Sequence, residues 1–188
     1  MCIRDRSKVI AGNKGANVRD SPLETQVQTR CFRSVLSFGQ KGESVGMFNK
    51  PWGVAVNGQD EIVVTECWNH RVSVFSSDGT HLRSFGMEGQ NNGEFNQPSW
   101  IAFDSLGNIV VTDYRNHRAQ VFDRNGTFLR KFGEYGILDH QLSYPEGLSI
   151  NGNGDIIVAD YGDKLIKIIS SNGKYLRKFG GSGALVSP

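Results

Sequence analysis

The stretch PSWIAFDSLGNIVVTDYRNHRAQVFDRNGTFLRKFG, residues 98–133, belongs to a set of three copies spaced 47 residues apart. It is identical to residues 51–86 at 17 of 36 positions, whereas shared composition alone would give roughly two. Residues 145–180 still match it at 13 of 36 positions, including Tyr114 with Tyr161 and the closing Leu-Arg-Lys-Phe-Gly. Self-similarity at a fixed period in the forties predicts a repeat architecture.

Each copy divides into four short apolar runs separated by turn residues. In the middle copy the runs are residues 101–103, 109–112, 119–122 and 128–132, and Asn125-Gly126 is a hairpin signal between the last two. β-branched and aromatic residues dominate the runs, and none is long enough for a helix. The sequence therefore predicts an all-β chain of four-stranded antiparallel meanders that pack face to face, as in the blades of a β-propeller.

The linkers between the copies repeat with the same register. Each has Gly at the end of the fourth run, a large apolar residue nine positions later and Pro twelve positions later. These residues are Gly39, Gly86 and Gly133, then Phe48, Phe95 and Leu142, then Pro51, Pro98 and Pro145. Gly permits a tight reversal and Pro fixes the entry to the next strand, so we expect Pro98 and Gly133 to be architectural.

The repeated pattern resembles the NHL repeat, named for an Asn, His and apolar trio. Asn69-His70 and Asn116-His117 match it, whereas the third copy has Asp163, Lys164 and Leu165 in these places. The resemblance implies a partial propeller of three complete blades, residues 51–86, 98–133 and 145–180. Residues 35–38 would be one orphan outer strand, and a closed parent domain of this kind would have six blades.

The remaining segments do not fit this register. Residues 1–7 are expected to be a non-native leader, and residues 8–30 resemble the tail of a filamin-type immunoglobulin repeat followed by a linker. Residues 31–188 are assigned to the partial propeller.

Composition excludes several classes of protein. The charge of +2 gives no global attraction to nucleic acid, and no apolar run is long enough to span a membrane. The N-terminus has no apolar segment of the kind found in secretory signals. Cys2, Cys31 and Cys67 lie far apart, which favours free thiols and predicts a cytoplasmic protein.

Candidate binding residues gather on one predicted face. In such a meander the loop between the second and third strands lies on the same side as the linker to the next blade. The aromatic and cationic residues of these loops are Trp68, Arg71, Tyr114, Arg115, Arg118, Tyr161 and Lys164. Rings beside cations suit RNA, because bases stack on rings while phosphates pair with cations. We favour single-stranded or hairpin RNA as the partner, with a protein target as the alternative.

A structural role competes for part of this set. An acidic residue followed by Asn, His and Arg in successive blades also suits a buried bracket in which Arg pairs with the carboxylate of Glu66 or Asp113. This alternative applies to Asn69, Arg71, Asn116 and Arg118. The cations of the fourth strands, Arg83, Arg130, Lys131, Arg177 and Lys178, are interpreted as protection against pairing of strand edges.

An enzyme is the least favoured class. A metal-dependent lyase or hydrolase in the propeller channel would need ligands on the inner strands, and GVAV, IAF and LSI supply none. We expect no catalytic residue, metal site or cofactor in this chain. A filamin-like tail before NHL blades resembles tripartite-motif NHL proteins, in which a RING finger acts as a ubiquitin ligase and the propeller recognises targets. That activity would require domains absent from this chain.

Overall fold

The structure is a computed structural model that describes residues 36–180. These residues form twelve β-strands and one short 3₁₀ helix, η1, at Tyr114–Asn116. The strands are β1 Pro51–Val56, β2 Ile62–Glu66, β3 Arg71–Phe75, β4 His81–Phe85, β5 Pro98–Phe103, β6 Ile109–Asp113, β7 Arg118–Phe122, β8 Phe128–Phe132, β9 Pro145–Ile150, β10 Ile156–Asp160, β11 Leu165–Ile169 and β12 Tyr175–Gly180.

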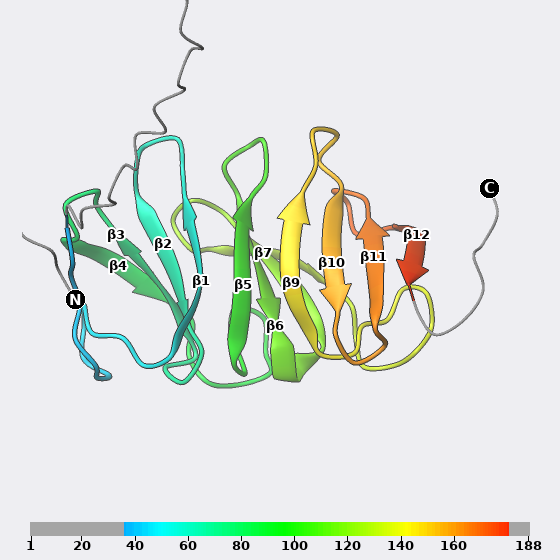
Figure 1. The fold of residues 1–188 in the computed structure, drawn as a ribbon, viewed down its shortest axis with the longest axis horizontal. Helices are drawn as coiled ribbons and strands as arrows, with labels where there is room; N and C mark the ends of the chain where they lie inside the picture. The colour runs from blue at the N-terminus through cyan, green and yellow to red at the C-terminus, as the bar shows by residue number, and fades with distance from the viewer. Residues whose placement is uncertain (1–35, 181–188) are drawn as a thin grey trace, which may run out of the picture. The chain divides into compact units, whose positions relative to one another are not determined.

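The strands form three four-stranded antiparallel meanders, β1 to β4, β5 to β8 and β9 to β12. Figure 1 shows the three sheets fanned side by side as blades, with β1, β5 and β9 neighbouring one another. This arrangement confirms the all-β class and the three complete blades.

The hairpin expected at Asn125-Gly126 joins β7 to β8. Gly126 has a positive φ of 88°, and its N–H donates to the carbonyl of Asp123 (3.0 Å). The Asp123 carboxylate also accepts the backbone N–H groups of Asn125 and Thr127. An acidic residue that bonds its own turn explains why this loop forms where the sequence places it.

Two apolar clusters fill the spaces between blades. Val63, Val72 and Val74 of the first blade pack against Ile101, Ile109, Val111 and Phe122 of the second. The same arrangement recurs between Val110 and Val121 of the second blade and Leu148, Ile156 and Val158 of the third. The middle sheet therefore buries both of its faces against its neighbours, which is how burial of apolar surface stabilises a propeller.

Hydroxyl groups add polar ties between neighbouring blades. The Thr65 hydroxyl on β2 donates to the carbonyl of Ser99 on β5 (2.6 Å), and the Thr112 hydroxyl on β6 donates to that of Glu146 on β9 (3.0 Å). Both threonines are buried, so each bond lies in surroundings where an unpaired hydroxyl would be costly.

The linker residue nine positions after Gly plugs each junction. Phe95 packs on Phe122 of β7, with ring centroids 5.4 Å apart, and Phe85 of β4 packs on the same ring at 5.0 Å. Phe38, Phe48 and Phe75 form the equivalent group before the first blade, with centroids 5.2 to 6.2 Å apart.

The expected orphan strand is only partly realised. Val35 lies outside the described residues, and residues 36–38 are not in a β-strand. A strand needs a hydrogen-bonded neighbour, and the described residues supply none here. Phe38 nevertheless takes the packing position of Phe85.

The arginines of the fourth strands have a different role from the one expected. Arg83 donates to the Glu61 carboxylate of its own blade and to the Arg124 carbonyl in the next blade (2.8 Å). Arg130 likewise donates to the Ser171 carbonyl of the third blade (2.8 Å). Interpreting these two residues as edge protection was wrong, because their guanidinium groups bond to carbonyls of the neighbouring blade.

The expectations for residues 1–7 and 8–30 concern segments outside the described residues. Among the described residues, no helix is long and apolar enough to cross a membrane.

Candidate recognition face

The loops that follow the second strand of each blade rest on the ends of the linkers. Trp68 N–H donates to the carbonyl of Asn49 (3.3 Å), Arg115 N–H to that of Asn96 (3.0 Å) and Gly162 N–H to that of Ser143 (2.7 Å). We call the surface formed by these loops and linkers the loop face. The seven candidate residues named from the sequence lie in these loops or at the start of the strand that follows them, and Arg118 is buried.

A buried carboxylate organises this face in the second blade. Asp113, at the end of β6, is fully buried. It accepts hydrogen bonds from Arg118 Nε (2.8 Å), Asn116 Nδ2 (2.8 Å) and the backbone N–H of Asn96 (2.7 Å). Burial raises the pKa of Asp113, while these three donors oppose the shift.

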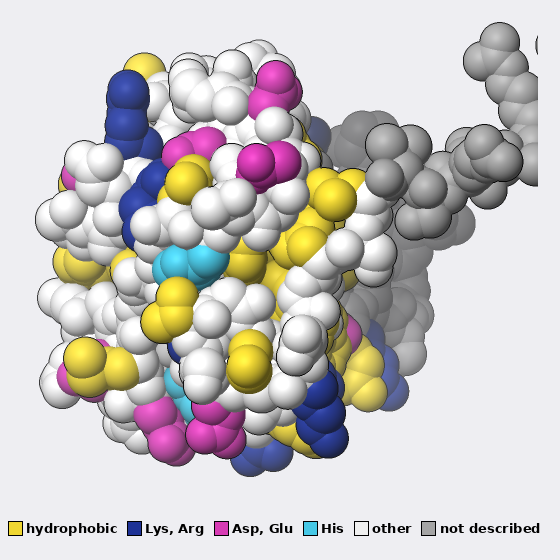
Figure 2. Space-filling view, turned by 90° about the vertical axis from the view of Figure 1, so that its left-hand side faces the viewer, with side chains coloured by type: hydrophobic (Ala, Val, Ile, Leu, Met, Phe, Trp, Pro, Cys, Tyr) yellow, Lys and Arg dark blue, Asp and Glu magenta, His cyan; other side chains and the backbone are white. Residues whose placement is uncertain are grey.

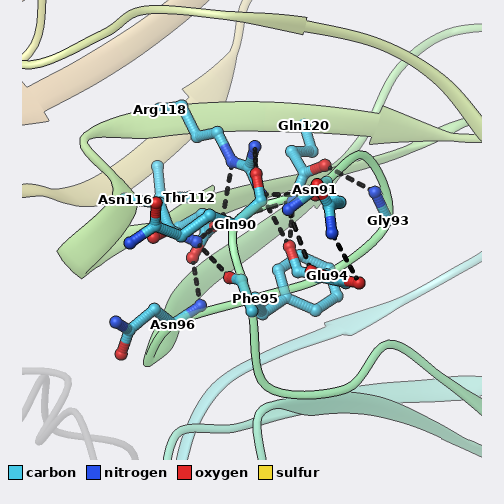
Figure 3. A network of polar contacts seen from close by, with 12 residues as sticks. Gln90, Asn91, Gly93, Glu94, Phe95, Asn96, Thr112, Asn116, Arg118 and Gln120 are labelled. Atoms are coloured by element: carbon cyan, nitrogen blue, oxygen red, sulfur yellow. Dashed lines mark hydrogen bonds and ion pairs between the residues drawn. The ribbon is translucent and has the colours of Figure 1, made fainter.

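The same bracket holds the linker before the blade. Figure 3 shows Arg118 and Gln120 on β7 reaching across to the loop. Arg118 donates to the carbonyls of Gln90 (2.7 Å), Asn91 (2.9 Å) and Glu94 (2.8 Å). Its side chain is only 5% exposed, and its donors are directed at the protein's own carbonyls.

The first blade repeats the bracket around Glu66. Arg71 pairs with Glu66 (2.8 Å) and donates to the linker carbonyls of Glu43, Ser44 and Met47. Asn69 donates to the same carboxylate and to Gly42. These hydrogen bonds are those of the structural alternative. The side chains of Asn69, Arg71, Asn116 and Arg118 bond a buried carboxylate and the linker carbonyls of their own chain.

The third blade builds the bracket with a different residue. Leu165 replaces the arginine, and Lys167, two positions further along β11 and on the same side of the strand, supplies the charge. Its ammonium pairs with Asp160 (2.8 Å) and Asp163 (3.0 Å) and donates to the carbonyl of Gln141 (2.6 Å). The departure from the motif at Asp163 is thus matched by a compensating cation.

Cations and tryptophans meet at the first blade. The Lys50 ammonium lies 4.5 Å from the ring centroid of Trp52 and 5.2 Å from that of Trp68, which is 55% exposed. Burial raises the pKa of the Cys67 thiol, and the charges of Lys50 and Arg115 oppose the shift. Arg115 follows β6 in the second blade, where its N–H donates to the carbonyl of Asn96. We call Lys50, Trp52 and Trp68 the tryptophan cluster.

A second aromatic group lies between the second and third blades. The His117 ring centroid is 4.6 Å from that of Tyr135 and 4.4 Å from that of Tyr144, which packs 5.2 Å from Tyr114. Burial and the nearby Glu146 carboxylate raise the pKa of Tyr114. We call these four residues the tyrosine cluster. Tyr161 and Lys164, both exposed, lie on the next loop.

The histidines of the motif link adjacent blades. His117 and His70 both have positive φ, 53° and 51°, and their rings point to the following linker. His117 Nδ1 accepts the backbone N–H of Tyr144 (3.1 Å), whereas His70 Nδ1 lies between the N–H of Gln97 (3.4 Å) and the carbonyl of Phe95 (3.3 Å). The link through His117 has a defined direction. An accepting Nδ1 requires the neutral ring, with its proton on Nε2.

The His117 link predicts a stability change in mild acid. Burial lowers the pKa of His117 below its ordinary value of 6.5, so the unfolded chain takes up the proton first. The contribution of this hydrogen bond to the free energy of unfolding is complete above pH 6.5. It declines as the pH falls from there toward the pKa of His117 in the folded state. We expect His117→Asn, which tolerates positive φ, to reduce this loss. Chemical unfolding of the unmodified chain and of His117→Asn at several pH values measures this loss of stability. Parallel pH profiles for the two proteins would contradict the assignment to His117.

Sequence reasoning named His117 only as a motif residue and missed four further residues of these clusters, which are Lys50, Trp52, Tyr135 and Tyr144. Lys50, Gln97 and Tyr144 each precede the linker Pro and adopt positive φ. The three positions vary in side chain while keeping one backbone conformation. The linkers were already expected on the loop face. Variation in side chain at this equivalent position of each linker could therefore have indicated Lys50 and Tyr144 as candidate binding residues.

A family model of the NHL repeat matches residues 48–75, 95–122 and 142–169. The chain contains three NHL repeats. Each matched segment runs from the apolar linker residue through the third strand and so contains the bracket. All three matched segments therefore contain a buried carboxylate paired with a cation, which is arginine in the first two and Lys167 in the third.

Its curated relatives are tripartite-motif NHL proteins. The B-box type zinc finger protein ncl-1 of Caenorhabditis elegans is 41% identical over 58 residues, which is 31% of this chain and 7% of that protein. The E3 ubiquitin-protein ligase TRIM71 of Xenopus tropicalis is 37% identical over 69 residues, 34% of this chain and 8% of that protein. The chain thus spans less than a tenth of the relatives it matches.

Solved structures show the same fold at low identity. Virginiamycin B lyase from Staphylococcus aureus matches with a TM-score of 0.56 at 18% identity, over 71% of this chain and 42% of that one. This likeness concerns the blade architecture alone. Within residues 36–180, no group of three or more His, Cys, Asp or Glu side chains is arranged to hold a metal ion.

Proposed function

We propose that this chain is a target-recognition module of a tripartite-motif NHL-type protein and that its loop face binds RNA. The support for RNA is the tryptophan cluster, where two indole rings lie beside Lys50. Trp68 presents its ring to solvent, and Arg115 is exposed. An exposed ring gives a base a stacking surface, while neighbouring cations pair with phosphates.

The proposed contacts follow from accessibility. Trp68, Tyr114, Arg115, Tyr161 and Lys164 remain from the residues named on sequence grounds, and Lys50 and Trp52 join them. Arg71 and Arg118 hold linkers in place and act on the ligand only by keeping the loop face in shape. Few free cations are present, so binding should be moderate in affinity and sensitive to salt.

Two substitutions test this proposal by fluorescence anisotropy with a random-sequence single-stranded RNA at several salt concentrations. Trp68→Ala removes a stacking surface and should weaken binding by about 1–3 kcal/mol, roughly 5- to 150-fold. Arg115→Glu should lower the salt slope by about one, because one phosphate contact is lost.

Asn125→Ala, in a turn between β7 and β8 on the opposite side of the blade, is the matched control and should bind as the unmodified chain does. An equal loss of RNA affinity in this control and in Trp68→Ala would contradict the proposal that RNA binds to the loop face. A hairpin RNA in the same assay separates single-stranded from folded targets.

The tyrosine cluster favours a protein target as the second candidate. Glu146 lies close enough to raise the pKa of Tyr114, and the adjoining linker carries Glu134 and Asp139. Carboxylates repel phosphates, while tyrosine is enriched at protein interfaces. If the chain shows no RNA affinity even at low salt, this candidate replaces the first.

The remaining proposals concern a longer parent protein. We propose that such a parent resembles a RING-type ubiquitin ligase, as the name of the TRIM71 relative indicates for that protein. We also propose a cytoplasmic location, supported by Cys67, which is buried and in no disulfide. The ligase proposal is tested by measuring ubiquitin-ligase activity of a parent protein with its RING and of the same protein after RING deletion. Activity should be present in the first and absent from the second.

A further inference from the structure

We propose that two tyrosines and a carboxylate on the loop face, Tyr114, Tyr144 and Glu146, bind an arginine side chain of a partner polypeptide. These residues lie where the second blade meets the third. Tyr114 follows β6, and Tyr144 and Glu146 lie at the entry to β9. We call the three residues the arginine site. The proposal rests on the protein-target candidate and does not depend on RNA binding at the tryptophan cluster.

Hydrogen bonds between the blades fix the residues of the arginine site relative to one another. The Thr112 hydroxyl, two residues before Tyr114, donates to the backbone carbonyl of Glu146 (3.0 Å). The backbone N–H of Tyr144 donates to His117 Nδ1 (3.1 Å). The arginine site is therefore built at an interior junction, with a complete blade on either side of it.

Two tyrosine rings form one wall of the arginine site. The ring centroids of Tyr114 and Tyr144 lie 5.2 Å apart, with their planes inclined by 46°. The His117 ring packs on Tyr144 with its plane inclined by 65° and its centroid 4.4 Å away. Tyr144 is 37% exposed, and Tyr114 is partly exposed. Both rings are thus held in place and accessible, and a ring positioned in advance loses little freedom when a ligand binds.

The side-chain oxygens of the arginine site are available to a ligand. Among residues 36–180, Tyr114, Tyr144 and Glu146 form hydrogen bonds through their backbone groups only. Burial and the nearby Glu146 carboxylate raise the pKa of Tyr114, so the carboxylate acts on the ring pair. Two phenol oxygens and a carboxylate are therefore free to accept hydrogen bonds beside an aromatic surface.

A guanidinium group matches this combination of groups. It has five N–H donors and no acceptor, it bonds a carboxylate through two parallel hydrogen bonds, and it stacks on aromatic rings. A phosphate would be repelled by Glu146, and an apolar side chain would leave the carboxylate without a partner. Lysine carries a point charge that cannot form the paired hydrogen bonds. Charge and hydrogen-bonding capacity therefore both favour arginine.

The attraction for arginine is local to this junction. The chain has a net charge of +2, so it does not draw cations from a distance. Figure 2 views the side of the first blade and shows acidic side chains intermixed with Lys and Arg there. Arg115 lies near the arginine site, since its charge opposes the rise in the pKa of Tyr114. We therefore expect Arg115 to compete weakly with the arginine of a partner.

Titration of the full chain with the peptide acetyl-Gly-Arg-Gly-amide, followed by backbone amide signals in NMR spectra, tests the proposal. The signals of Tyr114, Tyr144 and Glu146 should shift. The corresponding lysine peptide should bind about fivefold more weakly, because it loses one hydrogen bond to the carboxylate. A citrulline peptide, which keeps the shape of arginine without its charge, should cause no shift. Equal shifts with citrulline and arginine, or shifts confined to other residues, would overturn the proposal.

Substitutions identify the groups that bind the peptide. Glu146→Gln removes the charge at constant size and should weaken binding of the arginine peptide by roughly tenfold or more. Tyr114→Leu removes one ring and should weaken it by about two- to fivefold. Arg115→Ala should strengthen it by about twofold. Glu88→Gln removes the same charge at an exposed position of the preceding linker and is the matched control. Equal binding by Glu146→Gln and Glu88→Gln would refute the arginine site.

The same titration separates the arginine site from the RNA proposal. Trp68→Ala should leave binding of the arginine peptide unaltered, since Trp68 belongs to the tryptophan cluster of the first blade. Glu146→Gln should not reduce RNA affinity, because it removes a charge that repels phosphates. Loss of peptide binding in Trp68→Ala would assign the peptide to the tryptophan cluster and overturn the arginine site.

Discussion

Replacing Asp113 by Ala is expected to lower the free energy of unfolding by about 3–5 kcal/mol, because it leaves the Arg118 guanidinium buried without its counter-charge. Three further donors, Asn116, Gln120 and the N–H of Asn96, lose this acceptor in the same change. The loss should be seen in urea unfolding followed by circular dichroism.

Lys178→Ala is the matched control, because it removes an ion pair with Asp139 at a site where both side chains are exposed. This change should leave the urea midpoint unaltered. If Asp113→Ala is as stable as the control, then the bracket is not what fixes the linker, and Arg118 becomes available as a ligand contact.

Gly133→Val is expected to destabilise the chain by about 2–4 kcal/mol, combining backbone strain with a clash. Gly133 has a positive φ of 85°, which a β-branched residue resists, and an added Cβ would lie 2.6 Å from Leu142 Cδ1 and 3.1 Å from the carbonyl of His117. The substitution would therefore dislodge the apolar residue that plugs the junction between the second and third blades.

Gly58→Val provides the comparison, since a Cβ at Gly58 would meet no heavy atom within 4 Å. Its unfolding free energy should change far less than that of Gly133→Val. Unaltered stability of Gly133→Val together with a specific loss of RNA affinity would show that Gly133 serves binding and not architecture.

The blades could be predicted from the sequence because repetition supplies register. Three copies in phase fix where strands begin, which residues plug the linkers and which loops share a face. The bracket was foreseen for Arg71 and Arg118 as an alternative, since an acidic residue five positions before Arg recurs. Lys167 was not foreseen, because its partnership with Asp160 depends on side chains two residues apart pointing to the same side of β11.

The rest depends on how neighbouring blades meet. Tyr144 and Tyr135 join His117 only when a linker folds over the previous blade, a contact that no local pattern encodes. Arg130 was assigned to an edge because its strand is outermost, whereas it lies opposite Val121, on the side of the sheet that faces the third blade, and donates to the carbonyl of Ser171 there. Residues 36–38 do not form a strand for a related reason. A strand forms only beside another strand that supplies its hydrogen bonds, and the pattern of residues 36–38 alone cannot show whether one is present.

The most direct test of the recognition face compares the RNA affinity of Trp68→Ala with that of Asn125→Ala in one titration at low salt. Both substitutions shorten an exposed side chain in a loop, and they lie on opposite sides of the blades. We expect a loss of about 5- to 150-fold for Trp68→Ala and none for Asn125→Ala. Equal affinity of the two variants would contradict the assignment of this face to RNA.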